Sequence, residues 1–137
     1  QCFLKEEVMS NITDVELYKL ARKAARNAYA PFSGFRVGAA ILTTTGEIFT
    51  GVNVENSSYG ATICAERVAC AKAISEGFRN FEAIAVATYS GDQAVPCGMC
   101  RQFLFEFAPN LKVITGRDEE NIEVTSLDEL LPKGFRL

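Results

Sequence analysis

The sequence predicts an α/β fold in which a mixed β-sheet carries helices on both faces. Residues 37–43 and 47–54 have strand character, and Thr45-Gly46 between them suits the turn of an antiparallel hairpin. After this hairpin, strand and helix patterns alternate, as they do in parallel pairing through helical crossovers. The apolar run from Ala83 to Ala87 is typical of a central strand that is buried on both faces.

The N-terminal part begins with a segment that shows no periodic pattern. We expect residues 1–12 to form an arm. Thr13 and Glu16 have the spacing of a capping box, and apolar residues recur beyond them at helical intervals. We therefore predict a helix to about Tyr29, which Pro31 ends by starting a turn.

The remaining elements follow from apolar spacing, capping residues and chain breakers. We predict two helices, two strands and a short last helix at 65–76, 98–107, 112–115, 122–125 and 126–131. No repeat, low-complexity tract or linker interrupts them, so we expect residues 1–137 to form a single domain.

Charge and composition exclude several classes of protein. The formal net charge is −3, and the basic residues are scattered along the sequence. Because nonspecific nucleic-acid binding needs a basic face, we expect no nucleic-acid partner. No apolar run approaches the roughly 20 residues of a membrane span, and no signal-peptide pattern is visible, so we expect no membrane partner and a cytoplasmic location.

The cysteine count restricts any metal chemistry. The sequence has five cysteines and no histidine. An odd number of cysteines without a secretion signal argues against a disulfide framework. A transition-metal site would therefore have thiolate or carboxylate ligands, and a carboxylate would have to carry acid–base chemistry near neutral pH.

Two short clusters hold the cysteines that could form such a site: Cys64-Ala65-Glu66-Arg67 and Pro96-Cys97-Gly98-Met99-Cys100-Arg101. Each stands at the predicted start of a helix, where backbone amides stabilise thiolates. Three thiols can hold a zinc ion and leave its fourth position open for water, which is the catalytic pattern. Glu66, two residues after the first thiol, could then move the protons.

Other interpretations of the cysteines remain open. A structural zinc site needs four protein ligands, and the fourth would have to be Cys2, Cys70 or a carboxylate. Cys2 lies in the expected arm, and Cys70 suits a small position in the core. A redox pair formed by Cys97 and Cys100 would leave the first cluster without a role, so we favour a catalytic zinc site.

With these residues in place, the sequence resembles the zinc-dependent cytidine deaminases. Cysteine rather than histidine at position 64 is similar to the free-nucleoside enzymes, which assemble as homotetramers. This resemblance implies a three-layer α/β/α sandwich with a mixed five-stranded sheet. Besides the two cysteine clusters, the matching segments between about Tyr29 and Phe135 are Ala30-Pro31-Phe32-Ser33-x-Phe35-x-Val37-Gly38-Ala39-Ala40, Gly51-x-Asn53-Val54-Glu55-Asn56 and Glu129-Leu130-Leu131-Pro132.

The resemblance also implies the metal chemistry of the site. Cys64, Cys97 and Cys100 would bind one Zn²⁺ per subunit. Arg67 would temper the negative charge of the thiolates, and Glu66 would be the catalytic proton carrier.

The substrate contacts are implied in the same way. Phe35 would pack against the cytosine ring, and the backbone of Ala65 would meet the edge of the base. Asn53 and Glu55 would bind the sugar hydroxyl. A carboxylate at that place would repel a phosphate, which favours a nucleoside over a nucleotide.

The implied activity is hydrolytic deamination of cytidine and deoxycytidine to uridine and deoxyuridine, with release of ammonia, as in pyrimidine salvage. In the homotetramer, Tyr59 and Phe135 would reach the pocket of a neighbouring subunit. The alternative substrate is a related aminopyrimidine nucleoside such as blasticidin S. A non-catalytic zinc-stabilised module and a polynucleotide editor are further alternatives.

Overall fold

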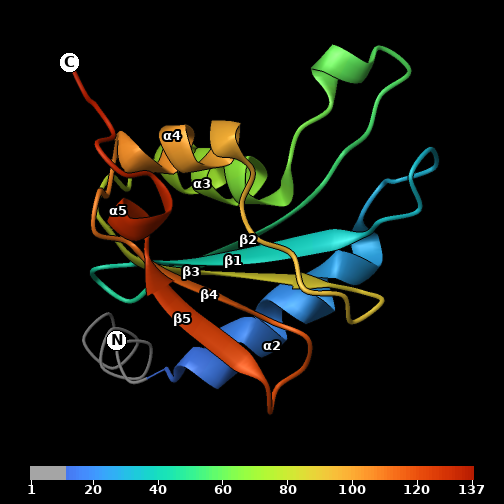
Figure 1. Cartoon of the computed structure of the whole chain (residues 1–137), viewed down its shortest axis with the longest axis horizontal. Helices are drawn as coiled ribbons and strands as arrows, with labels where there is room; N and C mark the ends of the chain where they lie inside the picture. The colour runs from blue at the N-terminus through green and yellow to red at the C-terminus, as the bar shows by residue number, and fades with distance from the viewer. Residues whose placement is uncertain (1–11) are drawn as a thin grey trace.

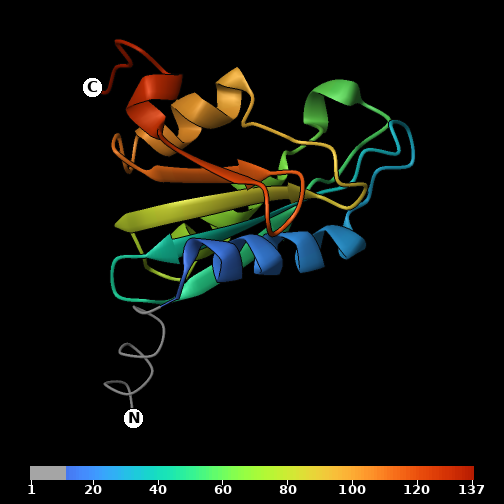
Figure 2. The same ribbon diagram turned by 60° about the horizontal axis from the view of Figure 1, so that its bottom comes forward.

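The computed structural model describes residues 12–137, which form three layers (Figures 1 and 2). A five-stranded sheet with strand order β2-β1-β3-β4-β5 lies in the middle. Helix α2 (Asp14–Ala24) covers one face, and α3 (Ala65–Ser75) and α4 (Gly98–Phe105) cover the other, with the short α5 (Leu127–Leu130) beside α4. The predicted sandwich is confirmed for these residues, while most of the expected arm lies outside them.

The sheet is mixed, as predicted. Strands β1 (Val37–Thr43) and β2 (Ile48–Val52) form the expected antiparallel hairpin. Strand β3 (Phe81–Thr88) is antiparallel to β1 and parallel to β4 (Lys112–Gly116), and β5 (Ile122–Ser126) is antiparallel to β4. Of the helices in residues 12–137, none has the length and apolar character that a bilayer span requires.

The strict alternation of a strand divides the core between the two helical layers. In β1, Ala39 and Ile41 belong to the cluster packed under α3 and α4. The intervening residues Ala40 and Leu42 belong to the cluster packed on α2. Because both faces of β1 and β3 are covered, these strands consist almost entirely of apolar residues.

Both predicted capping boxes mark helix starts. Glu16 N donates to Thr13 Oγ1 at 3.1 Å, and Thr13 N donates to Glu16 Oε1 at 2.9 Å, so α2 begins where the sequence indicates. At α5, Ser126 N donates to Glu129 Oε1 at 3.2 Å.

The first helix is shorter than predicted. Helix α2 ends at Ala24, and a 3₁₀ turn over Ala25–Asn27 follows. Tyr29 does not continue this helix because it pairs with the chain beyond β2: its N–H donates to Asn53 O at 3.0 Å, and its carbonyl accepts from Glu55 N at 2.8 Å. A tertiary contact thus replaces the helical bonds that the alanine-rich sequence favours.

The backbone of α3 packs directly against β2 at residue 51, which is a glycine. A Cβ atom on Gly51 would lie 2.4 Å from Ala69 N and 2.6 Å from Ala65 O, which are backbone atoms of α3. The missing side chain therefore sets the height of α3 above the sheet. Since α3 begins immediately after Cys64, this contact also sets the position of the first cysteine cluster.

We expect Gly51→Ala to lower the free energy of unfolding by about 1–3 kcal/mol, because the backbone of α3 must move to accept the methyl group. Urea unfolding followed by circular dichroism measures the change. Gly60→Ala is the matched control, since a Cβ there meets no atom within 4 Å. Equal unfolding midpoints for the two variants would contradict the close packing of α3.

Candidate active site

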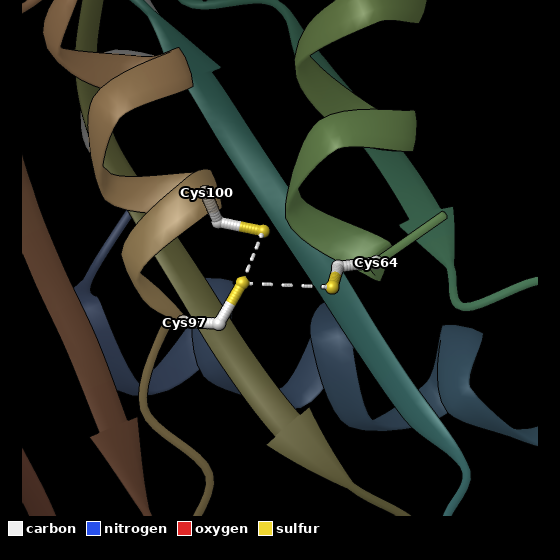
Figure 3. A group of neighbouring side chains, drawn as sticks. All are labelled: Cys64, Cys97 and Cys100. Carbon is white, nitrogen blue, oxygen red and sulfur yellow. Dashed lines mark hydrogen bonds between the residues drawn. The ribbon is translucent and has the colours of Figure 1, made fainter. Parts of the chain in front are cut away.

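Two helix starts bring three thiols together. Cys64 is the N-cap residue of α3, Cys97 is the N-cap residue of α4, and Cys100 lies in the first turn of α4. The three side chains point toward one another between the two helices (Figure 3). The Sγ atom of Cys97 lies 3.8 Å from that of Cys64 and 3.5 Å from that of Cys100, and all three Sγ atoms lie within 4.8 Å of one another.

This triangle fits zinc. Tetrahedral coordination with Zn–S bonds of about 2.3 Å places sulfur atoms about 3.8 Å apart. Within residues 12–137, no fourth cysteine or carboxylate joins the group. Cys70 is a fully buried core residue of α3, as predicted, and its burial raises the pKa of its thiol to about 12. Cys2 lies outside the described residues.

The charges around the thiols prepare them to bind a cation. The neighbouring Cys100 thiol and the guanidinium of Arg67 lower the pKa of Cys64 to about 5, against the effect of burial. Arg67 Nη2 donates to Cys64 Sγ at 3.8 Å. The pKa of Cys100 is raised in turn, because it shares a proton with Cys64. Arg67 thus stands where the sequence predicts, against the first thiolate.

Glu66 combines deep burial with access to a cavity that Cys64 and Cys97 also line. Its side chain is only 4% exposed, and this burial raises its pKa to about 7, with the negative charge of Cys64 adding to the shift. Its own backbone amide and Arg67 oppose the shift without cancelling it. A carboxyl group with a pKa near neutrality can both hold and release a proton under working conditions.

A cavity of about 190 Å³ opens beside Glu66 and the thiols. Three of the predicted substrate-contact residues, Phe35, Asn53 and Ala65, line it. Besides Cys64, Glu66 and Cys97, the rest of the wall was not among the predicted site residues, because most of it is apolar and apolar residues of strands and loops give no functional signal in a sequence. These wall residues are Val37, Thr62, Val86, Ala94 and Val95.

Both predicted sugar contacts hold the chain, and one of them, Asn53, also lines the cavity. Asn53 Oδ1 accepts from Val37 N at 2.9 Å, and Asn53 Nδ2 donates to Phe35 O at 2.8 Å. Glu55 does not line the cavity, and its carboxylate accepts hydrogen bonds from Phe32 and Ser33. The sequence pattern gave no sign of these anchoring bonds.

Tyr59 and Phe135 do not line the cavity of their own chain. Tyr59, at the start of the 3₁₀ helix η2 (Tyr59–Ala61), is 75% exposed and meets Phe32 edge-on, with ring centroids 6.0 Å apart. Phe135 is 65% exposed. Helix η2 and the C-terminus lie at opposite ends of the layer formed by α3 and α4 (Figures 1 and 2).

A second, shallower cavity lies along α2. Four basic residues of α2 and its 3₁₀ extension surround it together with Tyr89 and Glu119, so the basic side chains are less scattered than the sequence suggests. Arg22 Nη1 lies 3.9 Å from Glu119 Oε1. No thiol lines this cavity. The basic residues are Lys19, Arg22, Lys23 and Arg26.

Comparison with known proteins agrees with this site. Residues 11–116 match the family profile of the cytidine and deoxycytidylate deaminase zinc-binding region. A probable cytidine deaminase of Dictyostelium discoideum is 50% identical over 116 residues, which are 84% of this chain and 78% of that protein. The cytidine deaminase of Halalkalibacterium halodurans is 46% identical over 120 residues, covering 87% of this chain and 91% of that one.

Solved structures extend the agreement to three dimensions. The crystal structure of cytidine deaminase from Burkholderia pseudomallei superposes with a TM-score of 0.85 at 43% identity, covering 90% of this chain and all of that chain. The cytidine deaminase of Mycobacterium tuberculosis gives a TM-score of 0.83 at 38% identity, covering 93% of this chain and all of that chain.

We expect the purified protein to contain one zinc ion per chain, and Cys97→Ser to bind far less, because two thiolates hold zinc more weakly than three. Elemental analysis after exhaustive dialysis measures the metal. Cys70→Ala is the control, since its thiol lies in the core away from the triangle. One zinc per chain in Cys97→Ser would contradict the assignment of the ligands.

Proposed function

This chain belongs to the cytidine and deoxycytidylate deaminase family, and from this membership we propose that it hydrolyses cytidine and deoxycytidine to uridine and deoxyuridine, releasing ammonia. The observation that carries the proposal is the triangle of thiols at two helix starts with a buried carboxyl group in the same cavity. This arrangement places a zinc site and a proton carrier close enough together to act on the same small substrate.

The residues divide the chemistry between them. Zinc held by Cys64, Cys97 and Cys100 supplies a Lewis acid that lowers the pKa of water. Glu66, with its pKa of about 7, accepts a proton from water and passes it to the ring nitrogen, which makes the amine-bearing carbon electrophilic. The oxygen of that water adds to this carbon, and Glu66 then takes the proton of the added hydroxyl and gives it to the amine, which leaves as ammonia while the carbon–nitrogen bond breaks and the carbonyl forms. Arg67 offsets part of the charge of the thiolates.

The cavity suits a nucleoside. Phe35 and the valines of the wall offer an apolar surface to a pyrimidine ring, and the backbone of Ala65 is available to the edge of the base. Asn53 Nδ2 retains a second N–H after its bond to Phe35, and Glu55 retains lone pairs, so both can bind a sugar hydroxyl. An ionised Glu55 disfavours a substrate phosphate.

The exposed aromatic residues favour a homotetramer in which neighbouring subunits complete each other's sites. Tyr59 and Phe135 are too exposed for core residues and stand outside the cavity of their own chain. Phe32, Met99 and Val95 are also more than half exposed. Apolar surface of this kind is typical of an interface between chains.

We place the reaction in pyrimidine salvage in the cytoplasm, where free nucleosides are its substrates.

We expect Glu66→Gln to lower kcat for cytidine by about 10²–10⁴-fold, because glutamine cannot carry a proton. Zinc content and thermal stability should stay close to the wild type. The fall in ultraviolet absorbance on deamination measures the rate, with blasticidin S as a second substrate. Glu76→Gln at the exposed end of the same helix is the control. A kcat of Glu66→Gln for cytidine within twofold of the wild-type value would contradict this mechanism.

If neighbouring subunits complete each other's active sites, two impaired variants should restore activity when they assemble together. Phe135→Ala and Glu66→Gln should each be impaired alone, whereas their co-expression should restore activity, because a Glu66→Gln chain can lend its Phe135 to a neighbour with intact Glu66. Co-expression of Phe135→Ala with a chain carrying both substitutions is the control. Equal activity in the two co-expressed samples, or a monomer by sedimentation, would exclude shared sites.

A further inference from the structure

The turn that carries Phe35 to the cavity is held by side chains. The N–H of Phe35 donates to Ser33 Oγ at 3.0 Å, and its carbonyl accepts from Asn53 Nδ2 at 2.8 Å. Both polar backbone groups of this residue are therefore bonded to side chains rather than to a neighbouring strand. Because Phe35 is 41% exposed and lines the cavity, these bonds rather than core packing fix its position.

Glu55 anchors the same turn from the other side. Its Oε1 accepts from Phe32 N at 2.9 Å and from Ser33 N at 3.2 Å, and its Oε2 accepts from the Ser33 hydroxyl. The Ser33 hydroxyl is the leading cause of the lowered pKa of Glu55, with the backbone amides of Phe32 and Ser33 contributing. The carboxylate is thus ionised and oriented before any substrate arrives.

We infer that Ser33 is a positioning residue that couples Glu55, the proposed sugar-binding carboxylate, to Phe35, which lines the cavity. Its hydroxyl donates to Glu55 and at the same time accepts from Phe35, so a single group fixes both. A hydroxyl is suited to this place because it can donate and accept together. The inference rests on the proposed function, and it adds that substrate binding depends on a residue outside the cavity wall.

The chain after the turn has its own anchors, so the effect of Ser33 is local. The side chain of Arg36 donates to Arg26 O and stacks over the ring of Tyr89, with its Cζ 4.6 Å from the centroid. Tyr89 N also donates to Arg36 O at 2.9 Å. Strand β1 follows directly. Loss of the Ser33 hydroxyl should therefore loosen residues 32–35 and leave the fold and the thiol triangle intact.

The kinetic test compares Ser33→Ala with Ser33→Thr, which retains the hydroxyl. We expect Ser33→Ala to raise KM for cytidine and the dissociation constant of uridine about tenfold each, as for the loss of a hydrogen bond to a charged group, with kcat changed less than about twofold. Ser33→Thr should restore most of the binding. Ser75→Ala, at the exposed end of α3, is the control. A fall in kcat with unchanged KM would overturn the inference.

Amide hydrogen exchange tests the contacts without relying on activity. The amides of Phe32 and Phe35 should exchange faster in Ser33→Ala, while those of β1 and α3 and the zinc content stay as in the wild type. Unchanged exchange would overturn the coupling, and faster exchange with unchanged uridine binding would overturn the positioning role. A wild-type protein that fails to deaminate cytidine would refute the proposed function, and exchange and uridine binding would still decide the role of Ser33.

Discussion

The structure depends on one constraint, the convergence of two helix N-termini on a single point above the sheet. Helices α3 and α4 start at Cys64 and Cys97, and their first turns leave unpaired backbone amides that favour negative charge. Three thiolates so close together would repel one another without such help. The close packing of α3 against Gly51 fixes the start of α3. The start of α4 is positioned by the β3–α4–β4 crossover, which connects two parallel strands.

The same convergence also determines the surroundings, and so the pKa, of Glu66. Glu66 is placed in the first turn of α3, where a helix dipole would normally keep a carboxylate ionised. Burial and the neighbouring thiolate outweigh the dipole and bring its pKa close to neutrality. In a chain that has no histidine, this shifted carboxyl group is the proton carrier that the proposed function requires near neutral pH.

Much of the fold and of the candidate site could be predicted from the sequence, because the residues that can bind metal or carry protons are rare types at fixed spacing. The thiol triangle, Glu66, the capping boxes and the hairpin all follow from local patterns. The early end of α2 could not be predicted, because Tyr29 leaves the helix to donate a backbone hydrogen bond to Asn53, which is distant in the sequence. The apolar wall of the cavity also escaped prediction, since Val86 in β3 has the same pattern whether it faces core or cavity.

The central claim is that the metal centre is open for catalysis and does not serve to hold the fold together. X-ray absorption at the zinc edge of the loaded protein tests it most directly, because it counts ligands without requiring turnover. The account predicts three sulfur neighbours at about 2.3 Å and one light atom at about 2.0 Å, and that light atom should be replaced when a competing ligand is added. Four sulfur neighbours, or a light atom that nothing displaces, would contradict it.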